Sequence, residues 1–539
     1  MSGAPGPVRL LVAVLAGAAA SGAIAPPRAV AQVEVDSAAR GTAPGDAEDP
    51  GLPPTHAEAA DWLASTPPDS AFPWLERLAE RIGPRLLRVD TLAVIPAAGA
   101  FPAVIPVATI GADGIREPSA AEEPGRLRVL ILGSQHGDER AGYEVALRLA
   151  RDLAGGELRP LLAVLDVAVV PALNPVGMRL GTREDAAGID PNRDHATLSS
   201  PAVRSLWRLH AAWRPHVVLD LHEMGPSPYA AQVGLPTHPN VDPGLVELAR
   251  FRLLPHVVRR LAEADVRFHE YVALHPDPAE PPVAGADTFV SLAPIAASNA
   301  RNAFSLAGAI GLLLETASAR EIDDLRERSD RLHLLASSFL EVIAGLEDEV
   351  RARTGRGAHD DPTPLLSLRA RNVADPERPF LRWQRWNERG VAVPDSLAPW
   401  RPVVETLAEL PVPGAWAIRP GAADLAALLA RHGIRIERLE RPVRLRVGVY
   451  REPDAPTFEV RTLEAGSWIV PADQPGQRLA FTLVEPGSED GWFGAAAPVT
   501  GHPPGAEPPV VRIERPLPDL PLRPADPVGA VGPAPELRG

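Results

Sequence analysis

The sequence predicts an α/β fold, in which a mainly parallel mixed sheet is flanked by helices and followed by a smaller β-rich α+β domain. Over most of the chain, short apolar runs of strand length alternate with longer segments of helical periodicity. This alternation is typical of parallel sheets covered on both faces. The 539 residues are enough for two or three domains at roughly 100 to 200 residues each. Hydrophobic residues make up 45% and charged residues 23% of the chain, as in ordinary globular proteins, so we expect a folded core.

The predicted strands are apolar runs bounded by polar residues, glycine or proline. They cover residues 126–133, 161–175, 216–223 and 308–318. Segments with helical spacing cover residues 138–153, 199–213, 243–265 and 321–350. The second of these has a proline directly after Ser200, which is a common helix start. In such sheets ligands bind beyond the carboxyl ends of the strands, so polar residues at those ends are candidates for a site.

The charge and the absence of cysteine exclude several classes of function. The formal net charge is −15, and nucleic-acid binding needs a concentrated positive surface, so we expect no nucleic-acid partner. The chain has no cysteine. Disulfides, thiolate metal sites, a cysteine nucleophile and a lipid anchor on an N-terminal cysteine are therefore excluded.

The N-terminus has the pattern of an export signal. Arg9 precedes an apolar run rich in alanine and glycine over residues 10–25, and the sequence AVAQ places small residues before Gln32. We expect a signal peptide over residues 1–31 and a flexible leader over residues 32–57. The alternative is an uncleaved anchor helix, but the run is short for a membrane span. The expected location is periplasmic or extracellular, with no membrane association after signal removal.

Four chemically active side chains lie where predicted strands end. His136 and Glu139 follow the first strand, His222 ends the third, and Glu315 ends the fourth. Two histidines and a carboxylate make a catalytic zinc set with one position open for water, and a further glutamate could act as general base. Alternatively, each is only a polar residue at a strand end, because His-x-x-Glu pairs arise often by chance. The combination favours a site for one Zn²⁺ per chain.

Four motifs in order, HGDE, NPVGMRLGTREDAAGIDPNRDH, LDLHE and GLLLET, resemble those of the zinc carboxypeptidase family, the carboxypeptidase A-like metallopeptidases. The resemblance implies a carboxypeptidase-like catalytic domain over residues 58–350. It also implies that His136, Glu139 and His222 bind zinc and that Glu315 is the catalytic base.

The second of these motifs carries the residues that the resemblance assigns to the substrate. Asn192 and Arg193 match the pair that binds the terminal carboxylate of a substrate. Asp190 matches the aspartate that orients a histidine ligand from outside the metal shell. Arg183 would polarise the scissile carbonyl, although the loop spacing does not decide between it and Arg179. The alternative is that the arginines form ordinary surface ion pairs.

Three residues near these motifs receive no role. Glu223 points to the strand face opposite His222 by period-two geometry and is left out. Asp220 shares the face of His222 but is as well explained by a structural role. His195 stands alone without partner spacing, which favours a surface position.

The sequence departs from the family pattern before the catalytic glutamate. Members usually have a tyrosine in the mobile segment there, but residues 287–315 contain none, and Tyr271 lies far upstream. Either Arg301 and Asn302 take over its contacts, or the lid differs.

The composition of the sequence changes in the C-terminal part. Residues 351–400 have the composition of a linker, residues 401–500 are predicted to form the β-rich accessory domain, and the proline-rich tail 501–539 is expected to be extended or disordered. Within the domain we expect a helix that ends at Gly433 and several strands, including one at residues 477–486. The region resembles the accessory region of some large bacterial members of the family. For Trp468 and Trp492, core packing is favoured over ligand stacking.

The predicted function is hydrolysis of the amide bond before a C-terminal residue, by a zinc metallopeptidase acting on peptides with a free C-terminal carboxylate. One alternative is a zinc deacylase of N-acyl amino acids or an amidase of cell-wall stem peptides. A second alternative is a catalytically inactive peptide-binding module. The side-chain preference and the oligomeric state stay open.

Overall fold

The computed structural model describes residues 51–96, 102–111, 125–225, 227, 229–276, 288–318, 324–354, 364–383, 396–494 and 507–525. The chain divides into two compact units, Met1–Gly51 and Leu52–Gly539, and the described residues belong almost wholly to the second. The predicted signal peptide and most of the predicted leader lie outside the described residues.

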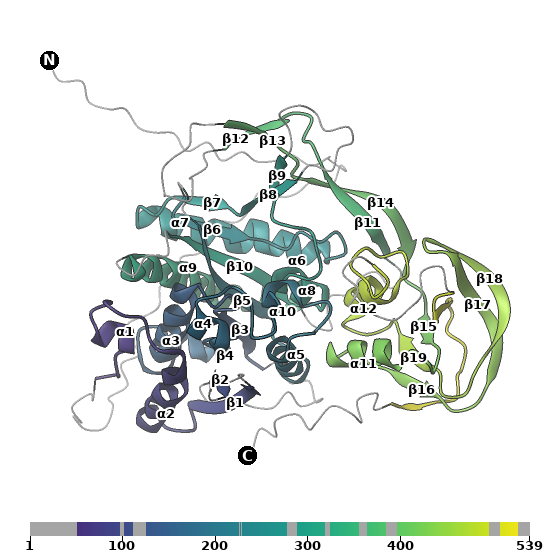
Figure 1. Ribbon diagram of the computed structural model, residues 1–539, viewed down its shortest axis with the longest axis horizontal. Coiled ribbons are helices and arrows are strands. Elements are labelled where there is room, and N and C mark those ends of the chain that lie inside the picture. The colour runs from purple at the N-terminus through teal and green to yellow at the C-terminus, as the bar shows by residue number, and fades with distance from the viewer. Residues whose placement is uncertain are drawn as a thin grey trace. The chain divides into compact units, whose positions relative to one another are not determined.

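The N-terminal part of the second unit is built on an eight-stranded mixed sheet with the order β1-β2-β4-β3-β5-β10-β6-β7 (Figure 1). The pairs β3–β4, β3–β5, β5–β10 and β6–β7 are parallel, and the others are antiparallel. The strands are β1 (Leu87–Ile95), β2 (Ala103–Ile110), β3 (Leu127–Gly133), β4 (Leu165–Val170), β5 (Val217–Met224), β6 (Ala231–Gly234), β7 (Phe268–Glu270) and β10 (Ile310–Ala317).

The four strands predicted from apolar runs are the four adjacent central strands, β4, β3, β5 and β10. Most of their side chains are buried, and Ile131, Val169 and Leu312 are completely so. Burial on both faces explains why these strands have near-continuous apolar sequences rather than alternating ones. The predicted mainly parallel mixed sheet flanked by helices is confirmed.

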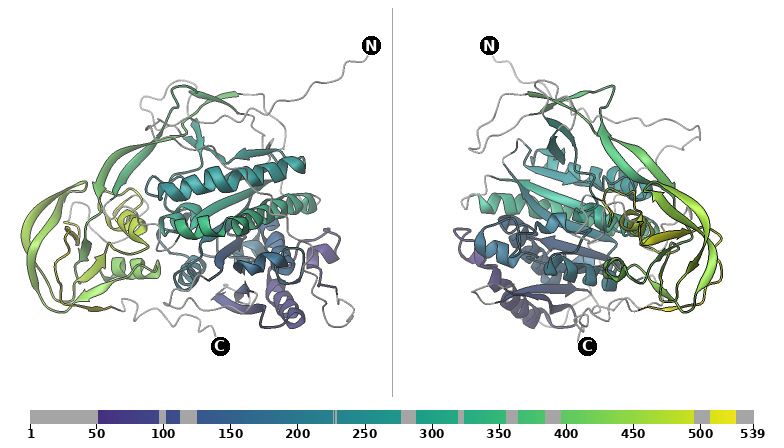
Figure 2. Two further views of the ribbon diagram at one scale, coloured as in Figure 1. Left: turned by 180° about the vertical axis from the view of Figure 1, so that it is seen from behind. Right: turned by 45° about the vertical axis from the view of Figure 1, so that its right-hand side comes forward.

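Helices cover both faces of this sheet (Figure 1). They are α2 (Ala71–Ile82), α3 (Arg140–Gly155), α4 (Pro175–Leu180), α5 (Pro201–Trp213), α6 (Pro243–Leu248), α7 (Leu254–Glu263), α8 (Ala300–Leu306), α9 (Leu325–Gly345) and α10 (Glu347–Arg353). Helix α9 packs against α3 and α7, and the left view of Figure 2 shows α7 and α9 side by side on one face. Helix α5 begins at Pro201, as predicted, with Ser200 as its N-cap.

The C-terminal part contains a seven-stranded sheet with the order β18-β17-β20-β15-β19-β16-β21. Its strands are β15 (Ala415–Ile418), β16 (Glu437–Leu439), β17 (Val443–Glu452), β18 (Ala455–Leu463), β19 (Trp468–Pro471), β20 (Val510–Ile513) and β21 (Leu522–Pro524). The helices α11 (Ala423–Arg431) and α12 (Gln477–Val484) pack against each other. The predicted helix end is present, because Gly433 follows α11 with a φ of 77°, which favours glycine.

Three two-stranded ribbons lie outside these two sheets. They are β8 (Val272–Pro276) with β9 (Thr288–Leu292), β11 (Leu365–Val373) with β14 (Val403–Pro411), and β12 (Phe380–Trp383) with β13 (Ser396–Pro399). Ribbon β11–β14 extends toward the C-terminal sheet (Figure 1).

Three expectations for the C-terminal part differ from the structure. The predicted linker 351–400 contains β11, β12 and β13. The predicted tail 501–539 supplies β20, which lies between β17 and β15 in the sheet. Residues 477–484 form α12 rather than a strand, since a short and mostly buried run is not readily assigned to a strand or a helix from its sequence alone.

Two smaller predictions can also be compared with the structure. Trp468 is buried in the core and carries the guanidinium of Arg438 at 4.4 Å from its ring centre, in agreement with a packing role. Trp492 is partly buried against the same core. Among the described helices, none combines the length and the apolar character that a membrane span requires.

Candidate metal centre

The turn between β3 and α3 presents His136 and Glu139 together. The Ser134 hydroxyl donates to the carbonyl of Glu139 at 2.8 Å. Gly137 lies so close to α4 that a Cβ atom there would be 2.1 Å from the carbonyl carbon of Gly177. Any side chain would force the turn away from α4, so glycine permits the close packing that directs both functional side chains inward.

The neighbouring strands β5 and β10 bring the other two predicted residues to the same place. Glu315 is the register partner of His222 across the parallel pair. Because side chains alternate along a strand, Asp220 shares the face of His222, and Leu313 shares the face of Glu315. The two strand ends therefore place a histidine and a glutamate side by side.

Three donor atoms converge at this point. Nδ1 of His136 and Nδ1 of His222 each lie 2.8 Å from a carboxylate oxygen of Glu139, and the two nitrogens are 3.1 Å apart. One ligand atom from each of the three residues lies within 4.8 Å of the others, and all three residues are buried. Imidazole nitrogen and carboxylate oxygen are ligands that Zn²⁺ prefers.

The other nitrogen of each histidine faces a further carboxylate. Nε2 of His136 is 3.1 Å from Asp190, and Nε2 of His222 is 2.9 Å from Asp220. A neutral imidazole that donates Nε2–H to an aspartate keeps the lone pair on Nδ1. Both lone pairs therefore face the Glu139 carboxylate, and this set fits a cation.

The electrostatics of the buried cluster agree with a cation site. Although burial opposes it, Asp220 and Glu139 raise the pKa of His222 well above its usual value. Burial likewise favours a protonated Glu139, but His136 and His222 hold its pKa well below the usual range. The cluster therefore favours positive charge between its donor atoms.

A cavity of about 230 Å³ adjoins the donor atoms. It is lined by His136, Glu139, Arg183, Asn192, Arg193, His222, Glu223, Met224, Gly225, Tyr271, Pro294, Asn299, Arg301, Leu313 and Glu315. Of the eight residues predicted for the site, all but Asp190 line the cavity, and Asp190 contacts His136 from outside it.

The structure separates the two candidate arginines. Nε of Arg183 donates to Asp190 at 2.8 Å, and its Nη1 lies 3.7 Å from Glu139. Arg179 instead pairs with Asp69 and does not line the cavity. The Asn174 side chain donates to the carbonyl of Arg183 at 3.2 Å, which fixes the segment that carries the guanidinium.

Asn192 and Arg193 follow Asp190 in a single turn, η3 (Pro191–Arg193). The Asn192 side chain accepts a hydrogen bond from the backbone of Ala300 at 2.8 Å, which joins it to the start of α8. Nη1 of Arg193 donates to the Asn192 carbonyl at 2.7 Å and to the Asn299 side chain at 3.1 Å. These bonds hold the exposed guanidinium at the cavity.

Tyr271 lies far upstream of Glu315 in the sequence, yet it lines the cavity. Its backbone donates to Val233 at 2.8 Å, which brings the residue to the cavity beside β6. Burial raises the pKa of Tyr271 to about 12, and the charge of Glu315 acts in the same direction. Chain spacing contains no signal for this position, because only the pairing of β6 with β7 creates it.

Of the two residues considered as substitutes for the lid tyrosine, the structure brings only Arg301 to the cavity. Asn302 is buried beside it, and its side-chain oxygen accepts from the backbones of Thr237 and His238 at 2.9 and 3.2 Å. Asn302 therefore fixes a neighbouring loop.

The expectation that His195 lies at the surface is wrong. The residue is completely buried, and burial lowers its pKa to about 3, so it is neutral. Nδ1 accepts from Trp207 at 3.1 Å, and Nε2 lies 2.9 Å from the side-chain oxygen of Gln135. Gln135 in turn donates to Asp220 at 2.8 Å. A hydrogen-bond chain thus runs from the helix layer to the partner of His222.

Glu223, which was left out of the site, has a structural partner. Its carboxylate lies 2.9 Å from Nε of Arg328 on α9. This ion pair is on the helix side of the sheet, in agreement with the period-two argument.

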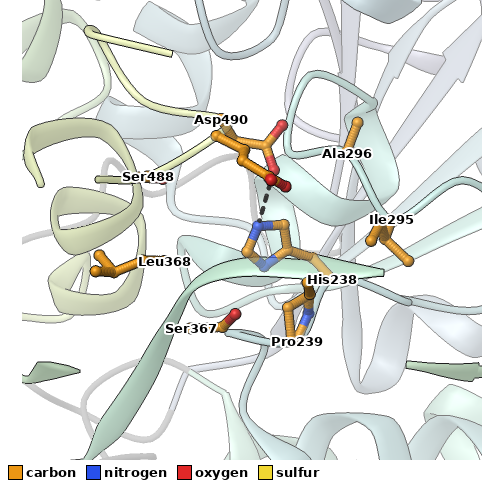
Figure 3. A pocket seen from close by; sticks show the side chains of 10 residues that line it. His238, Pro239, Ile295, Ala296, Ser367, Leu368, Ser488 and Asp490 are labelled. Atoms are coloured by element: carbon orange, nitrogen blue, oxygen red, sulfur yellow. Dashed lines mark ion pairs between the residues drawn. The ribbon is translucent and has the colours of Figure 1, made fainter. Parts of the chain in front are cut away.

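A second cavity of about 140 Å³ lies between residues of the two parts of the unit (Figure 3). Nε2 of His238 is 3.2 Å from the Asp490 carboxylate across it, and Figure 3 shows the imidazole pointing at that carboxylate. Ile295 lines this cavity while the preceding Pro294 lines the metal cavity. A single loop therefore contributes to both.

Comparisons with known proteins point to one family. The zinc carboxypeptidase family model matches residues 106–220. The chain is 26% identical over 443 residues to carboxypeptidase 2 of Trichophyton tonsurans, covering 74% of this chain and 78% of the relative. A shorter match, 40% identical over 68 residues, links 12% of this chain with 5% of human carboxypeptidase D. Among solved structures, a Pseudomonas aeruginosa metallo-carboxypeptidase matches 51% of this chain and 68% of its own, at 22% identity and a TM-score of 0.36.

Proposed function

We propose, from the premise that the chain belongs to the zinc carboxypeptidase family, that it hydrolyses the amide bond before the C-terminal residue of peptides, with Glu315 as general base. The enzyme is a zinc metallocarboxypeptidase. The observation that carries the finer proposal is the convergence of the ligand set, Glu315 and Arg193 on one cavity.

His136, Glu139 and His222 would hold Zn²⁺, which would supply a water molecule with a pKa lowered to about 7 and would polarise a carbonyl oxygen. Glu315 would accept a proton from the attacking water, and its register with His222 across the β5–β10 pair supports this role. The same carboxyl group then carries the proton to the nitrogen of the leaving amine, which departs as the free amino acid.

Arg183 and Arg193 would bind different parts of the substrate. The Arg183 guanidinium is held by Asp190 beside the ligand set, where it can donate to the carbonyl oxygen as that oxygen gains negative charge. Arg193 is exposed at the cavity, and its planar guanidinium suits the terminal carboxylate. Tyr271 remains protonated at neutral pH, so its hydroxyl can donate to a bound peptide.

The test compares the zinc-loaded chain with Glu315→Gln on a mixed peptide library that includes N-acyl amino acids and cell-wall stem peptides. We expect the parent protein to remove single C-terminal residues, as read by mass spectrometry. A chelator should abolish the release, and the variant should lower it by about 10²- to 10⁴-fold, as expected for loss of a general base.

The matched control is zinc content, which should stay at one per chain in Glu315→Gln because the ligand set is intact. Release of acyl groups instead of terminal residues would assign the chain to the deacylases. Full activity of Glu315→Gln at unchanged zinc content would contradict the role of Glu315.

A further inference from the structure

The metal cavity contains three arginines, and they differ in how their charge is compensated. Arg183 forms an ion pair with Asp190. Arg193 and Arg301 form no ion pair with any carboxylate in the part of the chain that the structure describes, and their hydrogen bonds go to neutral oxygens. The cavity therefore offers two positive charges that the described residues do not pair.

Arg301 differs from Arg193 in its burial. Its relative exposure is 3%, whereas Arg193 is exposed. Burying an unpaired guanidinium is unfavourable, so such groups in native proteins are usually paired or bind a ligand. Burial lowers the pKa of Arg301 to about 10, which leaves it charged at neutral pH.

The Arg301 side chain is held in a defined orientation. Nε donates to the carbonyl of Leu235 at 3.2 Å, and Nη2 donates to the Thr237 hydroxyl at 3.1 Å and also to the carbonyl of Pro294. Within the described ranges, Nη1 makes no hydrogen bond to the protein. Two nitrogens thus anchor the guanidinium, and the third remains for a molecule in the cavity.

Close packing of α8 against β10 fixes the position of Arg301. A Cβ atom on Gly311 would lie 2.3 Å from the carbonyl oxygen of Arg301. A Cβ atom on Gly234 would lie 3.5 Å from the Cδ atom of Arg301. The glycine at position 311 therefore lets α8 lie directly against β10. This close packing places a long cationic side chain on the cavity wall.

The charged and titratable groups that influence Arg301 do not supply a dedicated partner. They are Tyr271, Arg193, Asp220 and Glu315. Asp220 is the partner of His222, Tyr271 is protonated at neutral pH, and Glu315 is the proposed base. None of these groups is available to neutralise Arg301 permanently.

We propose that the cavity selects substrates whose C-terminal residue is aspartate or glutamate, with Arg301 binding the side-chain carboxylate while Arg193 binds the terminal one. This assignment rests on the proposed function and deepens it by naming the substrate class. A C-terminal lysine or arginine is disfavoured because its charge would face the Arg301 guanidinium.

The test uses the full zinc-loaded chain and N-blocked dipeptides that differ only in the last residue, which is glutamate, glutamine, leucine or arginine. A hydrogen bond to a charged group contributes about 1.5–3 kcal/mol, so kcat/KM for the glutamate peptide should exceed that for its glutamine isostere by about 10- to 100-fold. Equal or better cleavage of the glutamine, leucine or arginine peptide would overturn the proposal and leave the carboxypeptidase activity standing.

Variants at position 301 separate recognition from a structural role. Arg301→Gln should bring the ratio of glutamate to glutamine cleavage close to one, because kcat/KM should fall more for the glutamate peptide than for the glutamine peptide. Arg301→Lys keeps the charge and should retain part of the preference. An equal fall on all four peptides would mean that Arg301 only supports the loops it bonds.

The control is Arg252→Gln, which removes an exposed arginine paired with Glu349 and should leave the ratio unchanged. If Arg301→Gln does not fold, the ratio of glutamate to glutamine cleavage in the parent and in Arg301→Lys still decides whether Arg301 recognises the side-chain carboxylate. If no peptide is cleaved, the proposed function fails, and calorimetric binding of N-acetylglutamate against N-acetylglutamine decides the inference separately. Equal affinity for the two would contradict it.

Discussion

The metal cavity and the core of the C-terminal sheet both bury charged groups, but they compensate the charge differently. In the C-terminal sheet, the Glu485 carboxylate accepts hydrogen bonds from Trp416 at 2.7 Å, from Tyr450 at 2.5 Å and from Arg512 at 3.0 Å. Every member of this cluster is buried. The chain supplies both signs of charge and the neutral donors as well.

The cavity compensates its charges incompletely. The lone pairs of His136 and His222 face the Glu139 carboxylate, and among the described residues the hydrogen bonds of Arg301 go to neutral oxygens. The comparison teaches that a buried charge completed by the chain contributes to folding, whereas one left incomplete indicates a ligand. Zn²⁺ would complete the first set, and we propose a substrate carboxylate for Arg301.

The largest effect on stability should come from breaking the complete cluster. Arg512→Met leaves the Glu485 carboxylate buried without its cation, and loss of one partner of a buried pair costs about 3–5 kcal/mol. We expect the free energy of unfolding to fall by that amount in chemical denaturation, with unchanged zinc content and kcat/KM in the folded fraction.

The double variant Arg512→Met with Glu485→Gln is the matched control for that change. It should recover part of the loss, since no unpaired charge remains. Reduced activity of Arg512→Met at undiminished stability would break the distinction between the two regions.

Glu144 represents a third arrangement, in which the described hydrogen bonds to a buried carboxyl group come from neutral donors. The Thr66 backbone and hydroxyl donate to it at 2.6 and 2.8 Å, yet burial raises its pKa to about 7 from its usual 4.5. The folded state therefore binds the proton more tightly than the unfolded state. Its stabilising contribution is fully present below pH 4.5 and is lost as the pH rises to about 7.

We expect the free energy of unfolding of the parent, measured relative to Glu144→Gln, to fall by about 3 kcal/mol over this range, at about 1.4 kcal/mol per pKa unit. Denaturation of both proteins at pH 4.5, 6 and 8 measures the difference and cancels the other titrating groups. A difference that does not change with pH would show that Glu144 is ionised in the folded state.

A smaller effect should follow from altering the support of a metal ligand. Asp220→Asn keeps the shape but removes the charge that holds the proton on Nε2 of His222. Loss of such a partner lowers metal affinity by about 10- to 100-fold. Competition with a chromophoric chelator measures this change, and Asp473→Asn at an exposed position serves as the control. Equal zinc affinity of Asp220→Asn and the parent would mean that Asp220 has only a packing role.

The central strands and the metal ligands could be predicted from the sequence because their signals are local. Strands buried on both faces have continuous apolar sequences, and the residue that follows each strand lies at the carboxyl edge of the sheet. The convergence of His136, Glu139, His222 and Glu315 at this edge was predicted in this way, and their roles as ligands and base stay predictions. Helix α12 was predicted as a strand because its short apolar sequence has too little periodicity to distinguish a helix from a strand.

The sequence by itself determined the mainly parallel sheet and the residue types gathered at its edge. The tertiary structure alone decided that Arg183 rather than Arg179 faces the cavity, that Tyr271 enters it, and that residues beyond 501 complete the C-terminal sheet through β20. The physical reason is the distance along the chain over which each signal acts. Hydrophobic periodicity acts over a few residues along the chain, whereas strand pairing and the compensation of a buried charge depend on neighbours that only folding brings together.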